Sequence, residues 1–296
     1  MTTFTGAPGS SAQPRALIVT IYGLYAREAG GWLSVASLIR LMAGLGCDEP
    51  AVRSSISRLK QRGVLESRRE DGAAGYALSG RGRAILAEGD ERIFERPRAT
   101  LADGWLLAVF SVPEPERSRR HALRSRLAWL GFGTVSAGVW IGPGHLVSQT
   151  AGVLERHGLA GYVDLFRAEY LAFGDVTEQV ARWWDLGRLH DLYQAFLDDA
   201  GPVLARWDRA GRAVPPTPPM PPSEAFADYV RALTAWRRLP FLDPGLPAEL
   251  LPGDWNGLRA AEVFAALRSR LAGPARAHAR AVIGTAGGDA GQGTTA

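Results

Sequence analysis

The sequence predicts an α+β protein with three domains: an N-terminal winged helix-turn-helix, a central ferredoxin-like βαββαβ domain and an α-helical C-terminal domain. Residues 15–98 carry helical patterns and then two short strands around a Gly-rich turn. Residues 104–172 follow the order β-α-β-β-α-β, which is typical of a ferredoxin-like unit. Residues 176–207 and 223–272 are helical and rich in aromatic side chains.

The size and composition of the chain bound its class. It has 296 residues, of which 46% are hydrophobic and 22% charged, enough for two or three domains with their own cores. It contains no apolar run near the roughly 20 residues that a membrane helix needs, and its first residues lack the pattern of a signal peptide. Cys47 is the single cysteine, so no internal disulfide is expected. We therefore expect a cytoplasmic protein with no membrane partner.

One helical pattern, residues 49–65, divides its surface in an unusual way. Val52, Ile56 and Leu59 fall at i, i+4 and i+7 and form one narrow apolar stripe. The opposite side carries small hydroxyl groups, an amide and cations. The pattern therefore predicts a helix that buries one narrow face and offers a polar, basic face to a partner.

The elements around that helix complete a helix-turn-helix with a wing. A shorter helix over 34–46 precedes it, with Ser34 as a plausible N-cap and Gly44 or Gly46 as its end. Two strands around a Gly-rich turn, over 63–79, follow it. In such a domain the second helix packs one stripe on its own domain and inserts the other face into a DNA groove.

The predicted DNA contacts are divided between the helix and the wing. Four side chains are expected to face the major groove: Arg53, Ser54, Ser57 and Arg58. Four more are expected near phosphates: Lys60, Arg62, Arg68 and Arg69. Residues 50–69 hold six basic and one acidic side chain, a local positive field that suits double-stranded operator DNA. An amphipathic surface helix with a solvated basic face is the structural alternative.

Composition shifts set the expected domain boundaries. The tails, at 1–14 and 275–296, are small, polar and Gly-rich, and we expect them to be disordered. The three domains are expected at 15–98, 99–174 and 175–274. Within the third domain, the Pro-rich stretch 210–223 predicts an extended loop, because prolines interrupt both helices and sheets.

The first of the two helices expected in the central domain, over 116–133, is strongly basic. Its arginines are Arg117, Arg119, Arg120, Arg124 and Arg126. They suit either phosphate binding or, as the simpler interpretation, a solvated helix face.

Taken together, these segments resemble the PaaX family of bacterial repressors, which control the degradation of phenylacetic acid and related aromatic compounds. The resemblance covers nearly all of 15–272. It is carried by WLSVASLIRLMAGLG (32–46), AVRSSISRLKQRGVL (51–65), YALSGRGRAIL (76–86), LAWLGFGTV (127–135) and LPFLDPGLPAELLPGDWNG (239–257). The last segment is the most specific, because its prolines, ELLP and the tryptophan come together in one order.

The resemblance implies a repressor that binds double-stranded operator DNA as a homodimer. It implies that the central domain is similar to the ferredoxin-like fold of a CRISPR-associated nuclease and that the C-terminal domain is helical. It also implies a small-molecule effector, an aryl-CoA thioester that releases the repressor from DNA. The related nuclease fold has an aspartate at the end of its first strand, where this chain has Ser111, so we expect no nuclease activity.

No catalytic, metal or cofactor site is expected, and we interpret the chain as a protein that is not an enzyme. The five histidines form neither an HExxH motif nor a Cys/His zinc spacing. The segment GFGTVSAG fails as a dinucleotide-binding fingerprint, because Ser136 stands where the third glycine is required.

The aromatic C-terminal region is where we expect the effector, between the central and C-terminal domains. The candidate residues are Trp183, Trp184, Tyr193, Trp236 and Arg237. Aromatic rings suit an aryl group, and an arginine suits a phosphate or a carboxylate. The alternative for these tryptophans is a packed core. The alternative function is a nucleic-acid-associated architectural or adaptor protein without a small-molecule switch.

Overall fold

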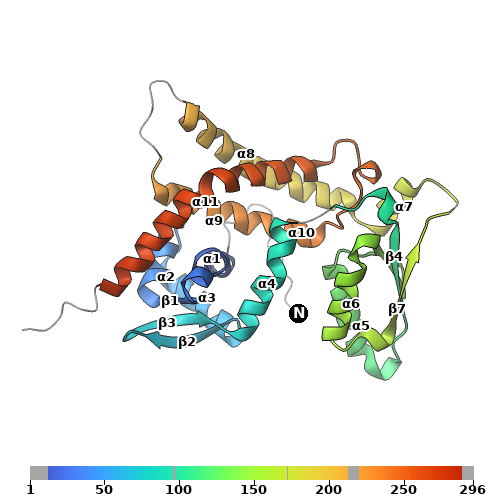
Figure 1. Cartoon of the computed structure of the whole chain (residues 1–296), viewed down its shortest axis with the longest axis horizontal. Helices are drawn as coiled ribbons and strands as arrows, with labels where there is room; N and C mark the ends of the chain where they lie inside the picture. The colour runs from blue at the N-terminus through green and yellow to red at the C-terminus, as the bar shows by residue number, and fades with distance from the viewer. Residues whose placement is uncertain (1–12, 96–97, 172, 213–219, 289–296) are drawn as a thin grey trace, which may run out of the picture. The chain divides into compact units, whose positions relative to one another are not determined.

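The computed structural model describes four stretches of the chain: 13–95, 98–171, 173–212 and 220–288. The chain forms two compact units (Figure 1). Unit 1 has three segments: Met1–Asp90, Ala195–Trp236 and Leu258–Ala296. Unit 2 has two segments: Glu91–Gln194 and Arg237–Gly257. Residues 1–12 and 289–296 of the predicted tails and residues 213–219 of the predicted Pro-rich loop lie outside the described residues.

Three helices form the N-terminal part of unit 1. They are α1 (Pro14–Ile21), which continues through a π-helical turn (Tyr22–Ala26) and a 3-10 turn (Arg27–Ala29), then α2 (Val35–Ala43) and α3 (Glu49–Gln61). The predicted cap of α2 is confirmed, because Ser34 Oγ accepts a hydrogen bond from the Ser37 backbone N–H at 3.0 Å. Asp48 caps α3 in the same way, accepting from the Ala51 N–H at 2.7 Å.

A three-stranded antiparallel sheet completes this part of unit 1. Its strands are β1 (Trp32–Ser34), β2 (Leu65–Glu70) and β3 (Ala73–Leu78), in the order β1-β3-β2. The predicted hairpin is β2 and β3, and its two-residue turn places Asp71 and Gly72 at φ values of 48° and 77°, as a tight hairpin turn requires. The pairing with β1 depends on Gly75, because a Cβ atom there would lie 2.4 Å from Trp32 Cε2.

Four longer helices complete the helical part of the fold. One follows the sheet directly and three come from the C-terminal half of the chain: α4 (Gly80–Phe94), α8 (Leu186–Arg212), α9 (Pro222–Trp236) and α11 (Asn256–Gly288). Within unit 1, α9 packs against α1. The hydroxyl oxygens of Thr20 on α1 and Thr234 on α9 lie 2.7 Å apart and are buried. The N-terminal helices and the C-terminal helices of unit 1 therefore share one packed interior.

Helix α11 extends further than the sequence indicates. The predicted disordered tail is wrong for residues 275–288, which continue the helix. Ala275 and Ala279 are fully buried on one face of it, and Arg276 forms an ion pair with Glu28 at 3.1 Å. The segment is rich in small residues, which in sequence look like a disordered tail, but its alanines form a narrow face that packs within unit 1.

Unit 2 contains a four-stranded antiparallel sheet with two helices on one face (Figure 1). In chain order the elements are β4 (Trp105–Phe110), α5 (Arg117–Trp129), β5 (Gly133–Ser136), β6 (Val139–Pro143), α6 (Val147–Arg156) and β7 (Val163–Ala168). The strand order is β5-β6-β4-β7. Leu106, Ala108 and Phe110 of β4 pack with Leu123 and Leu127 of α5 in the core. This is the predicted ferredoxin-like order of elements.

The other elements of unit 2 are short. They are α7 (Val176–Trp183), α10 (Leu239–Leu242) and the 3-10 turns Leu101–Asp103, Glu114–Glu116, Gly144–Leu146, Ala160–Tyr162 and Ala248–Leu250. Two tryptophans at the end of α7 lie over β5: a Cβ atom on Gly133 would be 2.6 Å from the Trp183 carbonyl oxygen and 2.7 Å from Trp184 Cε2. Gly133 is therefore required for this close approach.

Candidate nucleic-acid interface

Helix α3 has the two faces that the sequence predicts. Val52, Ile56 and Leu59 are 0%, 2% and 3% exposed, and they pack toward α1 and α2 of unit 1. Ser55 completes the buried face with 6% of its surface exposed. The helix is therefore anchored along one side, and its opposite side is open to solvent.

The four residues predicted to face the major groove all lie on the exposed side of α3. Arg58 Nη2 donates a hydrogen bond to Ser54 Oγ at 2.9 Å, so these two side chains form one joined polar group. Arg53 Nε donates to Glu49 Oε1 at 2.8 Å, which neutralises part of its charge. Ser57 is exposed and is small enough to permit close approach of a partner.

A group of cations lies toward the ends of α1 and α3. The pKa of Arg15, at the start of α1, is lowered. The larger cause is burial, and the positive charges of Arg62 and Arg58 add to it. Three guanidinium groups in one field favour an anion such as phosphate. Lys60 is exposed, and its Nζ lies 5.8 Å from the centroid of the Tyr76 ring. Arg15 cannot be assigned to this group from sequence alone, because it lies far from α3 along the chain.

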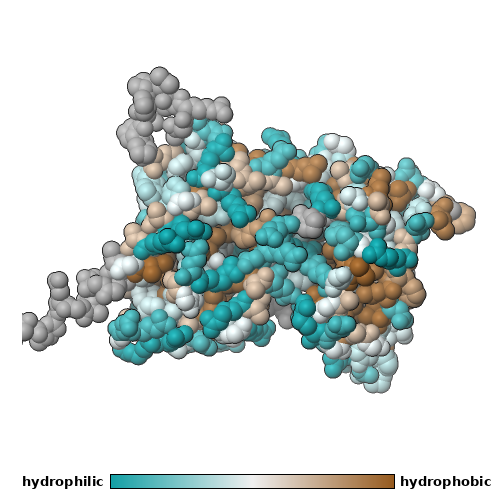
Figure 2. Space-filling model, in the orientation of Figure 1, coloured by the Kyte–Doolittle hydropathy of each residue, from teal (hydrophilic) through white to brown (hydrophobic). Residues whose placement is uncertain are grey.

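The hairpin carries the other two predicted phosphate contacts. Arg68 and Arg69 on β2 are exposed, and the surface over the hairpin is hydrophilic in Figure 2. Arg68 Nε pairs with Glu70 Oε1 at 3.1 Å, and Arg69 Nη2 donates to the Gly72 carbonyl oxygen at 2.8 Å. Both guanidinium groups are thus held near the turn of the hairpin.

The turn between α2 and α3 is held by a C-terminal helix of unit 1. Gly46 in this turn has φ 77°, a conformation that glycine adopts at low cost. Arg231 on α9 donates from Nη2 to the Leu45 carbonyl oxygen at 3.1 Å. This hydrogen bond connects α9 directly to the segment that sets the angle between the two helices.

The described stretches contain no group of three or more His, Cys, Asp or Glu side chains that could hold a metal ion. None of their helices is both long and apolar enough to cross a membrane. The described surface of α3 and of the hairpin carries exposed guanidinium, ammonium and hydroxyl groups, which are hydrogen-bond donors.

Family models match the chain in three consecutive parts. The model of the PaaX-like protein matches residues 13–82, that of the PaaX protein central Cas2-like domain matches 98–180, and that of the PaaX-like protein C-terminal domain matches 184–281. The chain belongs to the PaaX family. The resemblance drawn from the sequence is thus confirmed.

Two individual proteins are similar to this PaaX-family chain. The transcriptional repressor PaaX of Escherichia coli (strain K12) is 26% identical over 259 residues, which cover 86% of this chain and 79% of that protein. The solved structure of uncharacterized protein Rv0674 from Mycobacterium tuberculosis matches with a TM-score of 0.57 and 24% identity, covering 90% of this chain and 99% of that one. The second likeness shows a shared fold.

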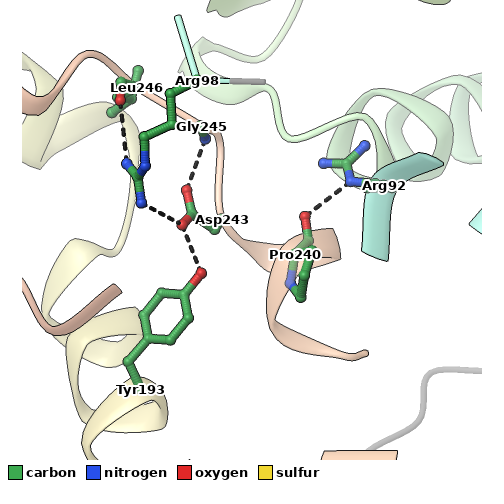
Figure 3. Close-up of polar contacts among 7 residues, drawn as sticks. All are labelled: Arg92, Arg98, Tyr193, Pro240, Asp243, Gly245 and Leu246. Atoms are coloured by element: carbon green, nitrogen blue, oxygen red, sulfur yellow. Dashed lines mark hydrogen bonds and ion pairs between the residues drawn. The ribbon is translucent and has the colours of Figure 1, made fainter. Parts of the chain in front are cut away.

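The segment 239–257, the most specific PaaX motif in this chain, is fixed by a buried carboxylate (Figure 3). Asp243 is 1% exposed. Its Oδ2 accepts from the Tyr193 hydroxyl at 2.6 Å, and its Oδ1 accepts from the Gly245 backbone N–H at 2.7 Å. Arg98 Nη2 lies 3.7 Å from Oδ2. A buried charge needs such partners, so each of them helps to fix the path of the segment.

A second arginine holds the first part of the same PaaX segment (Figure 3). Arg92 Nε donates to the Pro240 carbonyl oxygen at 2.9 Å. Its guanidinium carbon also lies 5.5 Å from the centroid of the Trp129 ring and 5.4 Å from that of Phe241, which is within the range of cation–π attraction. Segment 239–257 therefore packs against the rest of unit 2.

Two of the predicted effector residues lie together in unit 2. The ring of Trp105 on β4 is 5.6 Å from that of Trp183 at an interplanar angle of 80°, and 6.0 Å from that of Trp184 at 27°. Trp184 Nε1 donates to the Gly131 carbonyl oxygen at 2.9 Å. Tyr170 adds a fourth ring, 6.0 Å from Trp183.

The other three predicted effector residues have different surroundings. Tyr193 is buried against Asp243, as described above. Trp236 belongs to unit 1 and stacks on Phe264 with 4.8 Å between ring centroids. Burial, followed by the charge of Arg238, lowers the pKa of Arg237 to about 10. The effector residues as a set stay a prediction; within unit 2, the rings of Trp183 and Trp184 lie 6.1 Å apart.

Proposed function

We propose that this chain is a DNA-binding transcriptional repressor and that residues 15–98 form its winged helix-turn-helix domain. The observation that carries the proposal is the exposed face of α3, where Arg58 and Ser54 form a joined polar group opposite a fully packed stripe. The similar protein from E. coli carries the name transcriptional repressor, which supports the same function.

DNA recognition in this proposal is divided between two elements. The major groove of B-DNA admits an α-helix, and α3 enters it with Arg53, Ser54, Ser57 and Arg58 toward the base edges. Arginine reaches guanine O6 and N7, and small serines allow the helix to come close. The hairpin and the nearby cations contact phosphates, which add affinity without sequence preference.

The proposal extends to assembly. One such domain makes few contacts, so the chain acts as a homodimer on a palindromic operator, with half-sites one turn or a multiple of it apart, about 10 base pairs per turn. Most of the interface between the two copies is expected from the central and C-terminal parts of the chain.

The proposal also extends to control. Membership of the PaaX family supports an operon for the catabolism of phenylacetate or a related aromatic acid, with an aryl-CoA thioester as the effector that releases the repressor. The ligand must bind more tightly to the state that has the lower operator affinity. A preference of about 1–3 kcal/mol for that state lowers the operator affinity by roughly 5–150-fold.

In vitro selection from randomised duplexes tests the DNA-binding function. The wild-type chain is expected to enrich one palindromic sequence. Binding of that duplex is then followed against salt concentration for the wild type and for Arg69→Ala, with Ser67→Ala on the same strand as the control. Loss of one phosphate contact should weaken all duplexes about equally and reduce the salt slope by about 1. Absence of any enriched sequence would contradict the proposal.

A further inference from the structure

Unit 2 contains a cavity of about 510 Å³. It is lined by residues from several separate segments, among them Leu101, Trp105, Pro143, Tyr170, Pro247 and Leu250. All of them belong to unit 2. Its volume lies within the range of ordinary small-molecule sites.

The chemistry of the lining selects the kind of ligand group that fits. Most lining residues are apolar or aromatic, and among the described ones none is Lys, Arg or His. Glu169 is acidic and exposed, so it would repel an anion. Phosphates and carboxylates are therefore disfavoured inside, whereas an uncharged apolar group suits a lining that includes Trp105 and Tyr170.

The aromatic wall of the cavity is rigidly supported. Trp105 and Tyr170 line it, and both contact Trp183, at 5.6 Å and 6.0 Å between ring centroids. Trp184 stacks on Trp105 from the same region. The two tryptophans selected from the sequence thus support the residues that line the cavity.

Another part of the lining comes from the PaaX-specific segment. Pro247 and Leu250 line the cavity and directly follow the stretch that Asp243 fixes. The Gly245 N–H donates to Asp243, and the Gly245 carbonyl oxygen accepts from the Ala99 N–H at 2.9 Å. The buried carboxylate therefore sets the position of this part of the lining relative to residues 100–105.

We propose that this cavity binds the uncharged aromatic acyl group of the effector, while the charged remainder of the ligand stays outside it. The inference rests on the proposed control by an aryl-CoA thioester and adds the place and the selective group. Discrimination between thioesters then depends on the acyl group, because the cavity offers no cation for the phosphates among its described lining residues.

The test is calorimetric titration of the full-length chain with phenylacetyl-CoA and with acetyl-CoA. Val176, half-buried at the start of α7, lines the cavity, and its neighbour Thr177 is exposed and does not. Val176→Trp should fill the cavity and weaken phenylacetyl-CoA binding about tenfold or more, as overpacking does. Thr177→Trp, the matched control, should bind within about twofold of the wild type. Ala102→Trp, at another lining position, is a second filling variant in case the first does not fold.

The outcomes separate the cavity from the proposed function. Wild-type affinity for phenylacetyl-CoA in a folded filling variant would overturn this location, and so would equal affinity of the wild type for both thioesters. Operator affinity of each variant, measured without ligand, should equal that of the wild type. If the wild type binds phenylacetyl-CoA in the cavity but never binds a selected operator, the proposed repressor function fails while the cavity assignment stands.

Discussion

Arg58 is the residue on which we expect base recognition to depend most. Its guanidinium group is exposed on α3 and oriented by Ser54. Arg58→Ala should weaken binding of the selected operator by about 1–3 kcal/mol and relax the preference at one base position. Fluorescence anisotropy with the operator and with a scrambled duplex measures both effects. Gln61→Ala, also exposed on α3, is the control, and an equal loss on both duplexes would contradict a base contact.

Single residues also show where sequence patterns stop being informative. Val52, Ile56 and Leu59 were predictable, because their periodicity is local. Arg15 was not, since only folding brings its charge near that of Arg62. In the sequence, Asp243 looks like an ordinary loop aspartate. Its burial against Tyr193 was not predictable, because it depends on packing between segments 50 positions apart.

At the scale of elements, α9 is bonded to the turn between α2 and α3 of the proposed helix-turn-helix. Arg231 donates to the Leu45 carbonyl oxygen in the turn. A hydrogen bond from a charged group contributes about 1.5–3 kcal/mol, so Arg231→Met should lower operator affinity severalfold by letting α3 shift. Anisotropy titration measures the affinity, and Arg259→Met, an exposed change on α11, is the control. Unchanged affinity in Arg231→Met would show that the turn needs no such support.

The contact between α1 and α9 makes a prediction about stability. The Thr20 and Thr234 hydroxyls are buried 2.7 Å apart, and Thr234 also donates to the Val230 carbonyl oxygen at 2.6 Å. Thr20→Val or Thr234→Val should each cost about 0.5–1.5 kcal/mol of unfolding free energy, because the remaining hydroxyl loses its hydrogen bond to the other threonine and keeps only its bond to a backbone carbonyl oxygen. The double variant should cost less than the sum of the two. Denaturant unfolding of the wild type, the two single variants and the double variant gives the coupling free energy between the two hydroxyl groups. Strictly additive costs would argue against a direct interaction.

Most elements were predictable from the sequence because each has its own hydrophobic period and stop signals. Two outcomes were not. Strand β1 has three residues, too few for any alternation, and exists because Gly75 lets Trp32 approach β3. Residues 275–288 are small and polar enough to suggest a tail, but they pack as the end of α11 through Ala275 and Ala279.

At the scale of the whole molecule, we expect the second copy of the proposed homodimer to pack on the sheet of unit 2. Leu106, Ala108 and Phe110 face the helices, so Val109, on the same strand, lies on the other face, and it is 37% exposed. Phe166 on β7 is 52% exposed. Figure 2 shows hydrophobic colour on the surface of unit 2. Exposed apolar groups on one sheet face are typical of an interface.

Phe166→Glu should therefore convert the proposed homodimer into a monomer and weaken operator binding, because a buried charge at an apolar interface is costly. Light scattering at micromolar concentration measures the mass. Leu258→Glu, a similar change at an exposed residue of unit 1, should leave the dimer intact. A wild-type monomer with full operator affinity would contradict the dimer, and a dimeric Phe166→Glu would place its interface elsewhere.

One pair of titrations tests most directly whether the chain couples operator binding to the binding of an aromatic thioester, as we propose. Phenylacetyl-CoA is titrated into the wild-type chain with and without the selected operator, following tryptophan fluorescence, and operator affinity is measured with and without the ligand. We expect the ligand to weaken operator binding by roughly 5–150-fold and the operator to weaken ligand binding by the same factor, as linkage requires. Identical affinities in both conditions, or tighter ligand binding in the presence of the operator, would contradict release by this effector.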